Sequence, residues 1–335
     1  MRILIATGIY PPEIGGPAEY AKNLAEAWEN QGYEVKVEVF SQWNFLPTGI
    51  RHIAYFFSII SNIVSTGFVV TLDTFSAALP TLIASKIFRK KIILRTGGDF
   101  LWESYVERTG DKVLLRDFYK TSLDNLSIKE KMIFSLIRWT LQNLSAIIWS
   151  TEWQRDIFMK PYGLDSQKHF IVENYYGSRL QPVSSKEKSF IGSSRKLKWK
   201  NIDLLQDIFD GEEVKNTGAL LDISHTPHSE FLEKIRISYS VIVVSLGDIS
   251  PNTILDAIRC QKPFIVTKET GLYNRIKDIA IFVDPEDRED IKQKILWLSD
   301  QKNYDSQSEK IKSFSFTHLW EEMASEYINV YKSIK

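Results

Sequence analysis

The sequence contains almost no cysteine and has no excess of charge of either sign. One cysteine, Cys260, occurs among its 335 residues. A single cysteine excludes an intramolecular disulfide and any multi-cysteine metal site, and it fits a reducing compartment. Lysine plus arginine and aspartate plus glutamate both total 42, so the formal net charge is zero. Such a balance excludes a disordered polyelectrolyte and argues against nucleic-acid binding through bulk charge.

Long hydrophobic runs are also scarce. The N-terminal run MRILIA is followed at once by TGIYPPEIGG, so it is too short for the apolar region of a signal peptide. The longest uncharged stretch covers twenty residues between His52 and Asp73, but seven of them are Ser, Asn, Thr or Gly. That composition is poor for a bilayer span. We expect a core helix to about Val64 and then a strand, in a cytoplasmic protein.

Short β-prone runs alternate with helical segments along the whole chain. Residues 33–40 (YEVKVEVF) alternate apolar and polar side chains, and residues 241–245 (VIVVS) form a continuous apolar run. Strands that alternate with helices predict parallel sheets covered on both faces. The length favours two domains, and the Gly, Pro and Ser-rich segment 174–189 is the best linker. The sequence therefore predicts an α/β protein with two doubly wound domains.

A glycine pair follows the first expected strand, in the loop YPPEIGGP. Gly15 and Gly16 would let the backbone approach a ligand closely, although a simple tight turn explains them equally well. The dinucleotide fingerprint G-x-G-x-x-G is absent there, which removes the main support for a nicotinamide cofactor.

A second loop, residues 245–263, enters a helix in the other half of the chain. Ser250 and Pro251 resemble an N-cap and a first helical residue, which would leave the amides of Asn252 and Thr253 at the positive end of the helix. Such an end attracts phosphate.

Two carboxylates, Asp248 and Asp256, lie eight positions apart around this helix start. Both could face a ligand, one beyond the phosphates and one at a hydroxyl pair such as a ribose. The alternative is that Asp248 caps a turn and Asp256 is solvated, and spacing alone favours that alternative.

A basic run supplies a second positive feature. Residues 179–200 hold seven lysines and arginines against one acid, Glu187. Charge runs are usually solvated surface. Arg195 and Lys200, however, follow the first strand of the second expected domain, where cations could neutralise a diphosphate.

These segments resemble retaining glycosyltransferases of the GT-B architecture, in the large family of glycogen, sucrose and lipopolysaccharide-type transferases (glycosyl transferases group 1). The resemblance covers nearly the whole chain and lies in YPPEIGGP, LAEAWENQGYEVKV, STEWQRDIF, SSRKLKWKNIDLL, the Asp-x7-Asp segment and VTKETGLYNRI…IFVDPED. It implies two Rossmann-like doubly wound domains that face a cleft, with the C-terminal domain shortened. The implied boundaries are 1–176 for the acceptor-side domain, 177–313 for the nucleotide-sugar domain, and 314–335 for a helix that packs back on the first.

The resemblance implies a metal-independent hexosyltransferase of cell-envelope polysaccharide synthesis. It would move a sugar from a nucleotide-diphosphate donor to a glycan, lipid-linked or small-molecule acceptor, with no cofactor beyond the nucleotide sugar and no nucleic-acid partner. The donor-binding residues implied by the family pattern are Gly15, Gly16, Arg195, Lys200, Asp248, Pro251, Asn252, Thr253 and Asp256. The catalytic candidates are Asp248, Asp99, Arg195 and Lys200.

Three departures from the family pattern stand out. Both motif carboxylates are Asp rather than Glu, each shorter by one C–C bond of ~1.5 Å. One strand–helix pair is missing between Lys200 and Asp248. The acceptor-side histidine of the family is replaced by RTGGDFLWE, where Asp99, Trp102 and Glu103 are candidates for acceptor binding or proton handling. A turn with Trp102 packed beneath it explains that segment equally well.

Other interpretations remain open at this stage. The same scaffold could serve a sugar-nucleotide epimerase or a non-catalytic binding protein. His225 and His228 fit a helix-start loop better than a metal site. Aromatic helices near Tyr55–Phe57 and Ile133–Trp139 could touch a lipid-linked acceptor, as a peripheral contact at the inner face of a membrane, but core packing is favoured.

Overall fold

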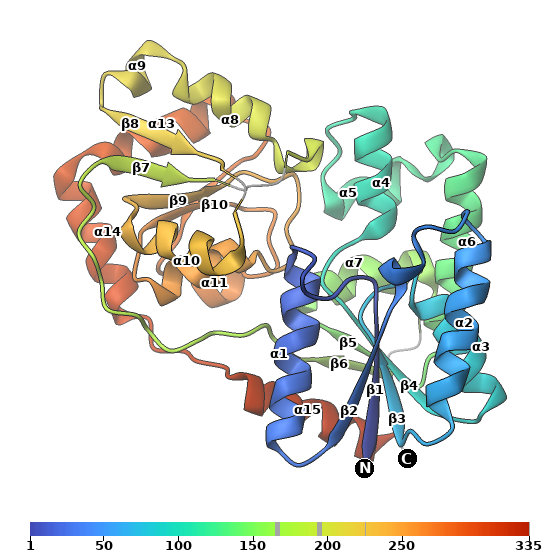
Figure 1. Ribbon diagram of the computed structural model, residues 1–335. Helices are drawn as coiled ribbons and strands as arrows, with labels where there is room; N and C mark the ends of the chain where they lie inside the picture. The colour runs from blue at the N-terminus through green and yellow to red at the C-terminus, as the bar shows by residue number, and fades with distance from the viewer. Residues whose placement is uncertain (165–167, 193–195, 225, 335) are drawn as a thin grey trace. The chain divides into compact units, whose positions relative to one another are not determined.

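The computed structural model describes all residues except 165–167, 193–195, 225 and 335. The chain forms two compact units (Figure 1). The first unit comprises Met1–Leu101, Ser122–Asn174 and His318–Lys335, and the second comprises Trp102–Thr121 and Tyr175–Thr317. The predicted α/β class with two parallel sheets is confirmed.

The first unit is built on a six-stranded parallel sheet with the order β2-β1-β3-β4-β5-β6. Its strands are β1 (Arg2–Thr7), β2 (Glu34–Val39), β3 (Phe68–Thr71), β4 (Lys91–Thr96), β5 (Ala146–Trp149) and β6 (His169–Ile171). All four residues of β3 and of β5 are buried, as expected of strands covered on both faces.

Helices cover both faces of this sheet. They are α1 (Gly16–Asn30), α2 (Ile50–Ile63), α3 (Ala78–Ile87), α6 (Ile128–Asn143), α7 (Glu152–Tyr162) and α15 (Trp320–Ser333), with 3₁₀ turns η1 (Phe40–Trp43) and η2 (Leu123–Asn125). Helices α2, α3 and α6 lie together on one side of the sheet, and α1 with α15 lies on the other (Figure 1).

The C-terminal helix α15 packs on α1 within the first unit. The hydroxyls of Tyr20 and Tyr327 are 2.8 Å apart, and the indole N–H of Trp28 donates to the carbonyl of Ala324 at 3.0 Å. Both tyrosines and Trp28 are buried. The C-terminal helix therefore supplies part of the hydrophobic core of the first unit, most of which comes from the N-terminal half of the chain.

The second unit is built on a five-stranded parallel sheet with the order β11-β10-β9-β7-β8. Its strands are β7 (Lys188–Ile191), β8 (Ala219–Asp222), β9 (Ser240–Val243), β10 (Phe264–Thr267) and β11 (Ile281–Val283). Its helices are α4 (Phe100–Thr109, which begins in the first unit), α5 (Leu115–Thr121), η4 (Lys198–Lys200), α8 (Ile202–Phe209), α9 (Glu212–Lys215), α10 (His228–Ile237), α11 (Asn252–Arg259), α12 (Tyr273–Ile276), α13 (Arg288–Ser299) and α14 (Gln301–Ser313). This sheet has one strand fewer than the first, and the shortening relative to the family pattern stays a prediction.

Residues 102–121 belong to the second unit although the chain enters them from β4 of the first. The amide of Leu115 donates to the carbonyl of Leu246 at 3.2 Å, and the indole ring centroids of Trp102 and Trp199 are 5.4 Å apart. This segment lies inside the range 1–176 that the sequence assigned to one domain.

The aromatic helices divide between core and surface. Tyr55 and Ile133 are buried, in line with the favoured interpretation, but Phe57 and Trp139 are exposed. Within the part of the chain that the structure describes, none of the helices is both long and apolar enough to span a bilayer.

Candidate functional site

Two of the expected site residues meet at the carboxyl edge of the second sheet. The ammonium Nζ of Lys200 lies 2.6 Å from Oδ2 of Asp248, and their side chains are only 10% and 12% exposed. Lys200 ends η4, in the loop after β7, and Asp248 lies in the loop between β9 and α11. The hydroxyl of Ser245 is 3.4 Å from the same carboxylate oxygen. The carboxyl edge of a doubly wound sheet is where such folds bind ligands.

Backbone hydrogen bonds hold the loop that carries Asp248. The amide of Leu246 donates to the carbonyl of Trp199, and the amide of Asp248 donates to the carbonyl of Glu269, both at 2.9 Å. Asp248 also forms an isolated parallel bridge with Thr270. The carboxylate therefore projects from a backbone that neighbouring loops fix on both sides.

Helix α11 begins one residue later than expected. Pro251 is the N-cap, with an extended ψ of 111°, and no side chain caps this end. The expectation of Ser250 as N-cap and Pro251 as first helical residue is therefore wrong by one position. The carbonyl of Pro251 accepts from Ile254 and Leu255. The amides of Asn252 and Thr253, which precede them, have no partner within the helix and remain at its positive end.

The second carboxylate of the pair, Asp256, is buried and contacts a histidine. Nε2 of His228, the first residue of α10, lies 2.9 Å from Oδ2 of Asp256. The alternative in which Asp256 is solvated is wrong, because its side chain is only 11% exposed. This contact could not be predicted from the sequence, since the two residues are 28 positions apart and no motif links them.

A further buried carboxylate, Glu269, was not a sequence candidate. Its side chain is 1% exposed, and Oε1 lies 3.0 Å from a guanidinium nitrogen of Arg116 on α5. Burial raises the pKa of Glu269, and the positive charges of Arg116 and Lys268 oppose that rise. The pair fastens α5 to the loop after β10.

The glycine pair lies in the first unit, at the start of α1. Gly15 is the N-cap and its carbonyl accepts from the amides of Ala18 and Glu19 at 3.0 and 3.2 Å. A Cβ atom at Gly15 would lie 3.0 Å from Cδ1 of Ile9. Close packing is thus one reason for glycine here, and the phosphate-cradle role of Gly15 and Gly16 stays a prediction.

The acceptor-side candidates have different surroundings. Asp99 is buried, and its Oδ1 accepts from the amide of Leu101 at 3.1 Å, at the start of α4. Trp102 is buried and its N–H donates to the carbonyl of Val113 at 2.9 Å. This agrees with the alternative interpretation, in which Trp102 packs in the interior. Glu103 is partly exposed on the first turn of α4.

Two residues named from the sequence, Arg195 and His225, lie outside the described residues. Among the residues that are described, no group of three or more His, Cys, Asp and Glu side chains could hold a metal ion.

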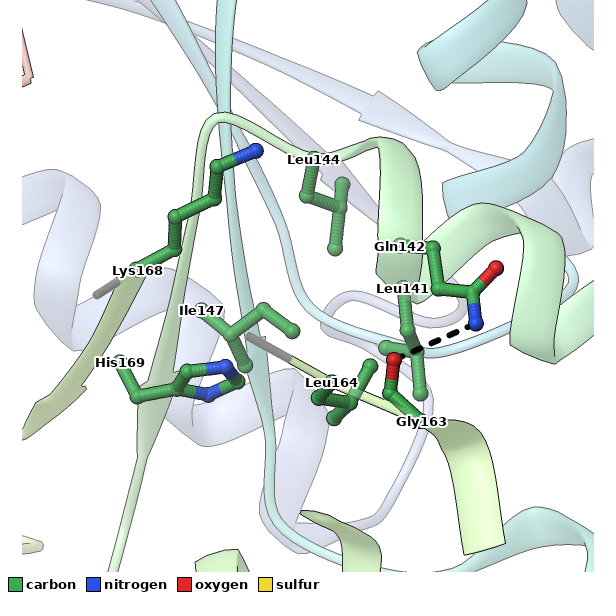
Figure 2. A pocket seen from close by; sticks show the side chains of 8 residues that line it. All are labelled: Leu141, Gln142, Leu144, Ile147, Gly163, Leu164, Lys168 and His169. Atoms are coloured by element: carbon green, nitrogen blue, oxygen red, sulfur yellow. Dashed lines mark hydrogen bonds between the residues drawn. The ribbon is translucent and has the colours of Figure 1, made fainter. Parts of the chain in front are cut away.

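A pocket in the first unit lies at the amino-terminal edge of its sheet, opposite the carboxyl edge. Figure 2 shows it between the end of α6, the end of α7 and the start of β6, where Lys168 and His169 face Leu144 and Ile147. The amide Nε2 of Gln142 donates to the carbonyl of Gly163 at 3.3 Å across one wall. This is the amino-terminal edge of β5 and β6, so the pocket is separate from the carboxyl-edge loops.

Comparisons with known proteins give structural matches only. No protein-family model and no curated protein sequence matches the chain. The sucrose-phosphate synthase of Thermosynechococcus elongatus is similar, with a TM-score of 0.69 at 12% identity over 99% of this chain and 98% of that one. HepE of Anabaena, solved with UDP, has a TM-score of 0.69 at 12% identity over 99% and 100%.

WaaG, a glycosyltransferase involved in lipopolysaccharide biosynthesis, has a TM-score of 0.68 at 10% identity over 98% of this chain and 99% of that one. At such identities the matches concern the fold. They agree with two parallel sheets of six and five strands. The chain therefore has the architecture of the GT-B glycosyltransferases along its full length.

Proposed function

We propose that this protein is a retaining glycosyltransferase that moves a sugar from a nucleotide-diphosphate donor to a hydroxyl group of a glycan, lipid-linked or small-molecule acceptor. The observation that carries the proposal is the buried Lys200–Asp248 pair at the carboxyl edge of the second sheet. The two residues are 48 positions apart, and each follows an expected strand of the second sheet.

Lys200 would act on the donor diphosphate. Its ammonium has three N–H groups, and one is engaged by Asp248, which leaves donors for phosphate oxygens. The amides of Asn252 and Thr253, at the positive end of α11, are proposed as a second source of positive potential, and Arg195 as a third. Charge develops on the diphosphate as the bond to the sugar breaks, and stabilisation of such charge by fixed donors is usually the largest catalytic term.

The two carboxylates would bind parts of the donor that lie on either side of its phosphates. Asp248 is proposed to contact the transferred sugar and Asp256 the ribose hydroxyls. Asp256 is held by His228 at one oxygen, which fixes its orientation. The HepE structure contains UDP, which supports a nucleoside diphosphate as the ligand class.

The first unit is proposed to bind the acceptor. Asp99 is the carboxylate of this unit that we propose to handle the proton of the acceptor hydroxyl. Trp102 and Glu103 follow it at the start of α4 and belong to the second unit, and they are proposed as further acceptor contacts. Gly15 and Gly16 are proposed to approach the donor phosphates from the start of α1.

Binding and transfer with UDP-, GDP- and ADP-sugars test the proposal. Calorimetry should identify a donor, and Lys200→Ala should reduce the transfer rate by about 100- to 1,000-fold, the usual effect of losing one fixed electrostatic donor. Lys292→Ala is the matched control, because Lys292 also pairs with a carboxylate, Glu213, at 2.8 Å but lies on the outer helix α13.

A wild-type transfer rate in Lys200→Ala would overturn the assignment of this residue. Absence of binding to all three donor classes would overturn the transferase proposal and favour a non-catalytic protein. Release of an altered nucleotide or sugar without any acceptor would instead identify an epimerase.

A further inference from the structure

Exposed apolar side chains gather on one helical layer of the first unit. Of seventeen large hydrophobic residues exposed in the described chain, nine lie on α2, α3 and α6 or at the C-cap of α2. They are Ile50, Ile53, Phe57, Val64, Ile83, Ile87, Ile128, Met132 and Trp139. Scattered exposed hydrophobic residues are normal, but a concentration on adjoining elements marks an interaction surface.

Helix α2 has an apolar stripe on its outer side as well as its inner side. Tyr55, Ile59 and Ile63 are fully buried, whereas Ile53 and Phe57 are 59% and 62% exposed. Ile50 precedes Ile53 by three positions and Phe57 follows it by four, so the three form one continuous outer stripe. Core packing explains the inner stripe, whereas the outer stripe is exposed among the residues that the structure describes.

The stripe continues across the neighbouring helices. Helix α3 contacts both α2 and α6, and the three lie together in Figure 1. The ammonium of Lys86 on α3 lies 5.4 Å from the ring centroid of Trp139 on α6 and bonds to the side chain of Asn143. Trp139, beside this lysine, is 41% exposed. An indole flanked by a lysine is typical of side chains at a membrane interface.

Exposed negative charge is absent from these three helices, all of whose residues are described. Residues 39–98 contain a single acid, Asp73, and its partly buried carboxylate accepts from the amides of Ala77 and Ala78 at the start of α3. Helix α6 contains one acid, Glu130, which is buried in a capping box with Ser127. The exposed charges are all positive: Lys86, Lys129, Lys131 and Arg138.

We propose that the outer face of α2, α3 and α6, here the apolar–basic face, docks on the surface of an anionic lipid bilayer. Apolar side chains bordered by lysine and arginine, with aromatic residues and no exposed acid, match the acyl boundary and the negative headgroups. Helix α2 has 14 residues and a bilayer span needs about 20, so the helices lie in the interface plane.

The inference goes beyond the proposed sugar transfer and does not depend on it. A lipid surface would bring lipid-linked acceptors to the first unit, but docking is measured without any donor or acceptor. Failure of docking would leave the transferase proposal untouched, and failure of transfer would leave the docking proposal untouched.

Flotation of the full chain with vesicles tests it. Vesicles of about one third phosphatidylglycerol in phosphatidylcholine should bind the protein at least about tenfold more tightly than pure phosphatidylcholine, and salt should weaken the binding. The double variant Ile53→Ser/Phe57→Ser and the double variant Lys129→Glu/Lys131→Glu should each weaken binding by about tenfold or more.

Matched controls lie on the second unit. Ile237→Ser/Trp297→Ser removes an isoleucine and a tryptophan that are 49% and 40% exposed, and Lys302→Glu reverses one exposed lysine. Both controls should bind vesicles as the wild type does, and thermal unfolding should show all variants folded. Equal binding by the face variants and the controls would overturn the proposal. So would a lack of vesicle binding, especially with a dimer in sedimentation that Ile53→Ser/Phe57→Ser dissociates, since the face would then join two copies of the chain.

Discussion

The two units share a doubly wound architecture and nearly equal length, yet their surfaces differ. Thirteen of the seventeen exposed large hydrophobic side chains lie in the first unit and four in the second. Surface ion pairs occur in both units, such as Arg2–Glu34 in the first and Lys292–Glu213 in the second, so the apolar side chains make the difference. One architecture therefore supports two kinds of surface, and the neutral overall charge averages over both.

The units also differ in how they bury a cation. In the first, Arg95 is buried with its guanidinium 3.8 Å from the ring centroid of Tyr20, and it bonds to Asn174 at 2.5 Å. In the second, Lys262 is buried and donates to the carbonyls of Val183 and Ser238 at 2.6 and 2.5 Å. Arginine keeps its charge at any pH that a protein survives, whereas a buried lysine can lose its proton.

The contrast between the inner and outer faces of α2 gives the largest expected effect on stability. Ile59→Ala should lower the free energy of unfolding by about 2–5 kcal/mol, because it leaves a cavity in the core of the first unit. Ile53→Ala on the same helix should change it by less than about 0.5 kcal/mol, because that side chain is exposed. Urea denaturation of both variants measures the difference.

Similar losses in the two variants would show that the outer stripe is packed against something, and the distinction between the two faces of α2 would fail. A large loss in Ile53→Ala alone would reverse the assignment of inner and outer faces.

The buried lysine of the second unit, Lys262, should make the free energy of unfolding change with pH in the alkaline range. Burial lowers the pKa of Lys262 from 10.5 to about 8. Between these values the unfolded chain binds more protons than the folded one, so stability rises with pH across the window. The rise should reach about 3 kcal/mol relative to Lys262→Met, which lacks the titrating group.

Denaturation at pH 7.5, 9 and 10.5 measures this difference, and subtraction of the Lys262→Met curve removes the titration of tyrosines. A wild-type curve parallel to that of Lys262→Met would contradict it. Arg95→Met, as the first-unit counterpart, should show no pH-dependent difference over the same window.

The contact of α5 with the loop that carries Gly247, within the second unit, gives the smallest expected loss of stability. A Cβ atom at Gly247 would lie 2.5 Å from Cβ of Leu115, a contact that only backbone movement relieves. Gly247→Ala should therefore cost about 1–2 kcal/mol and expose residues 102–121 to proteolysis. Gly8→Ala in the first unit is the control, since its nearest atom would be at 3.4 Å. Unchanged proteolysis of 102–121 in Gly247→Ala would separate this segment from the second unit.

Most of the elements follow from local pattern. The run at 241–245 predicts a strand that the structure has as β9, and the alternating pattern at 33–40 predicts the strand β2. Boundaries shift by one or two residues, as at Pro251, because the terminal backbone angle decides where a helix begins. Residues 102–121 were not separable, since nothing local shows that Leu115 bonds to Leu246.

Residues of the candidate site could be predicted from the sequence only where they belong to a recognisable motif. Lys200 and Asp248 stood out by their place after expected strands, and the structure brings them to 2.6 Å. His228 and Glu269 were missed as site neighbours because their importance lies in contacts with Asp256 and Arg116 that no spacing rule connects.

The sequence by itself determined the α/β class and the two parallel sheets, because buried parallel strands must be apolar and they alternate with helical segments along the chain. It also determined that residues 39–98 contain almost no acid. Only the tertiary structure decided which apolar residues of α2, α3 and α6 are core and which are exposed. The type of a hydrophobic residue does not show whether it lies on the buried or the exposed face of a helix. Its burial depends on what packs against it from elsewhere in the chain.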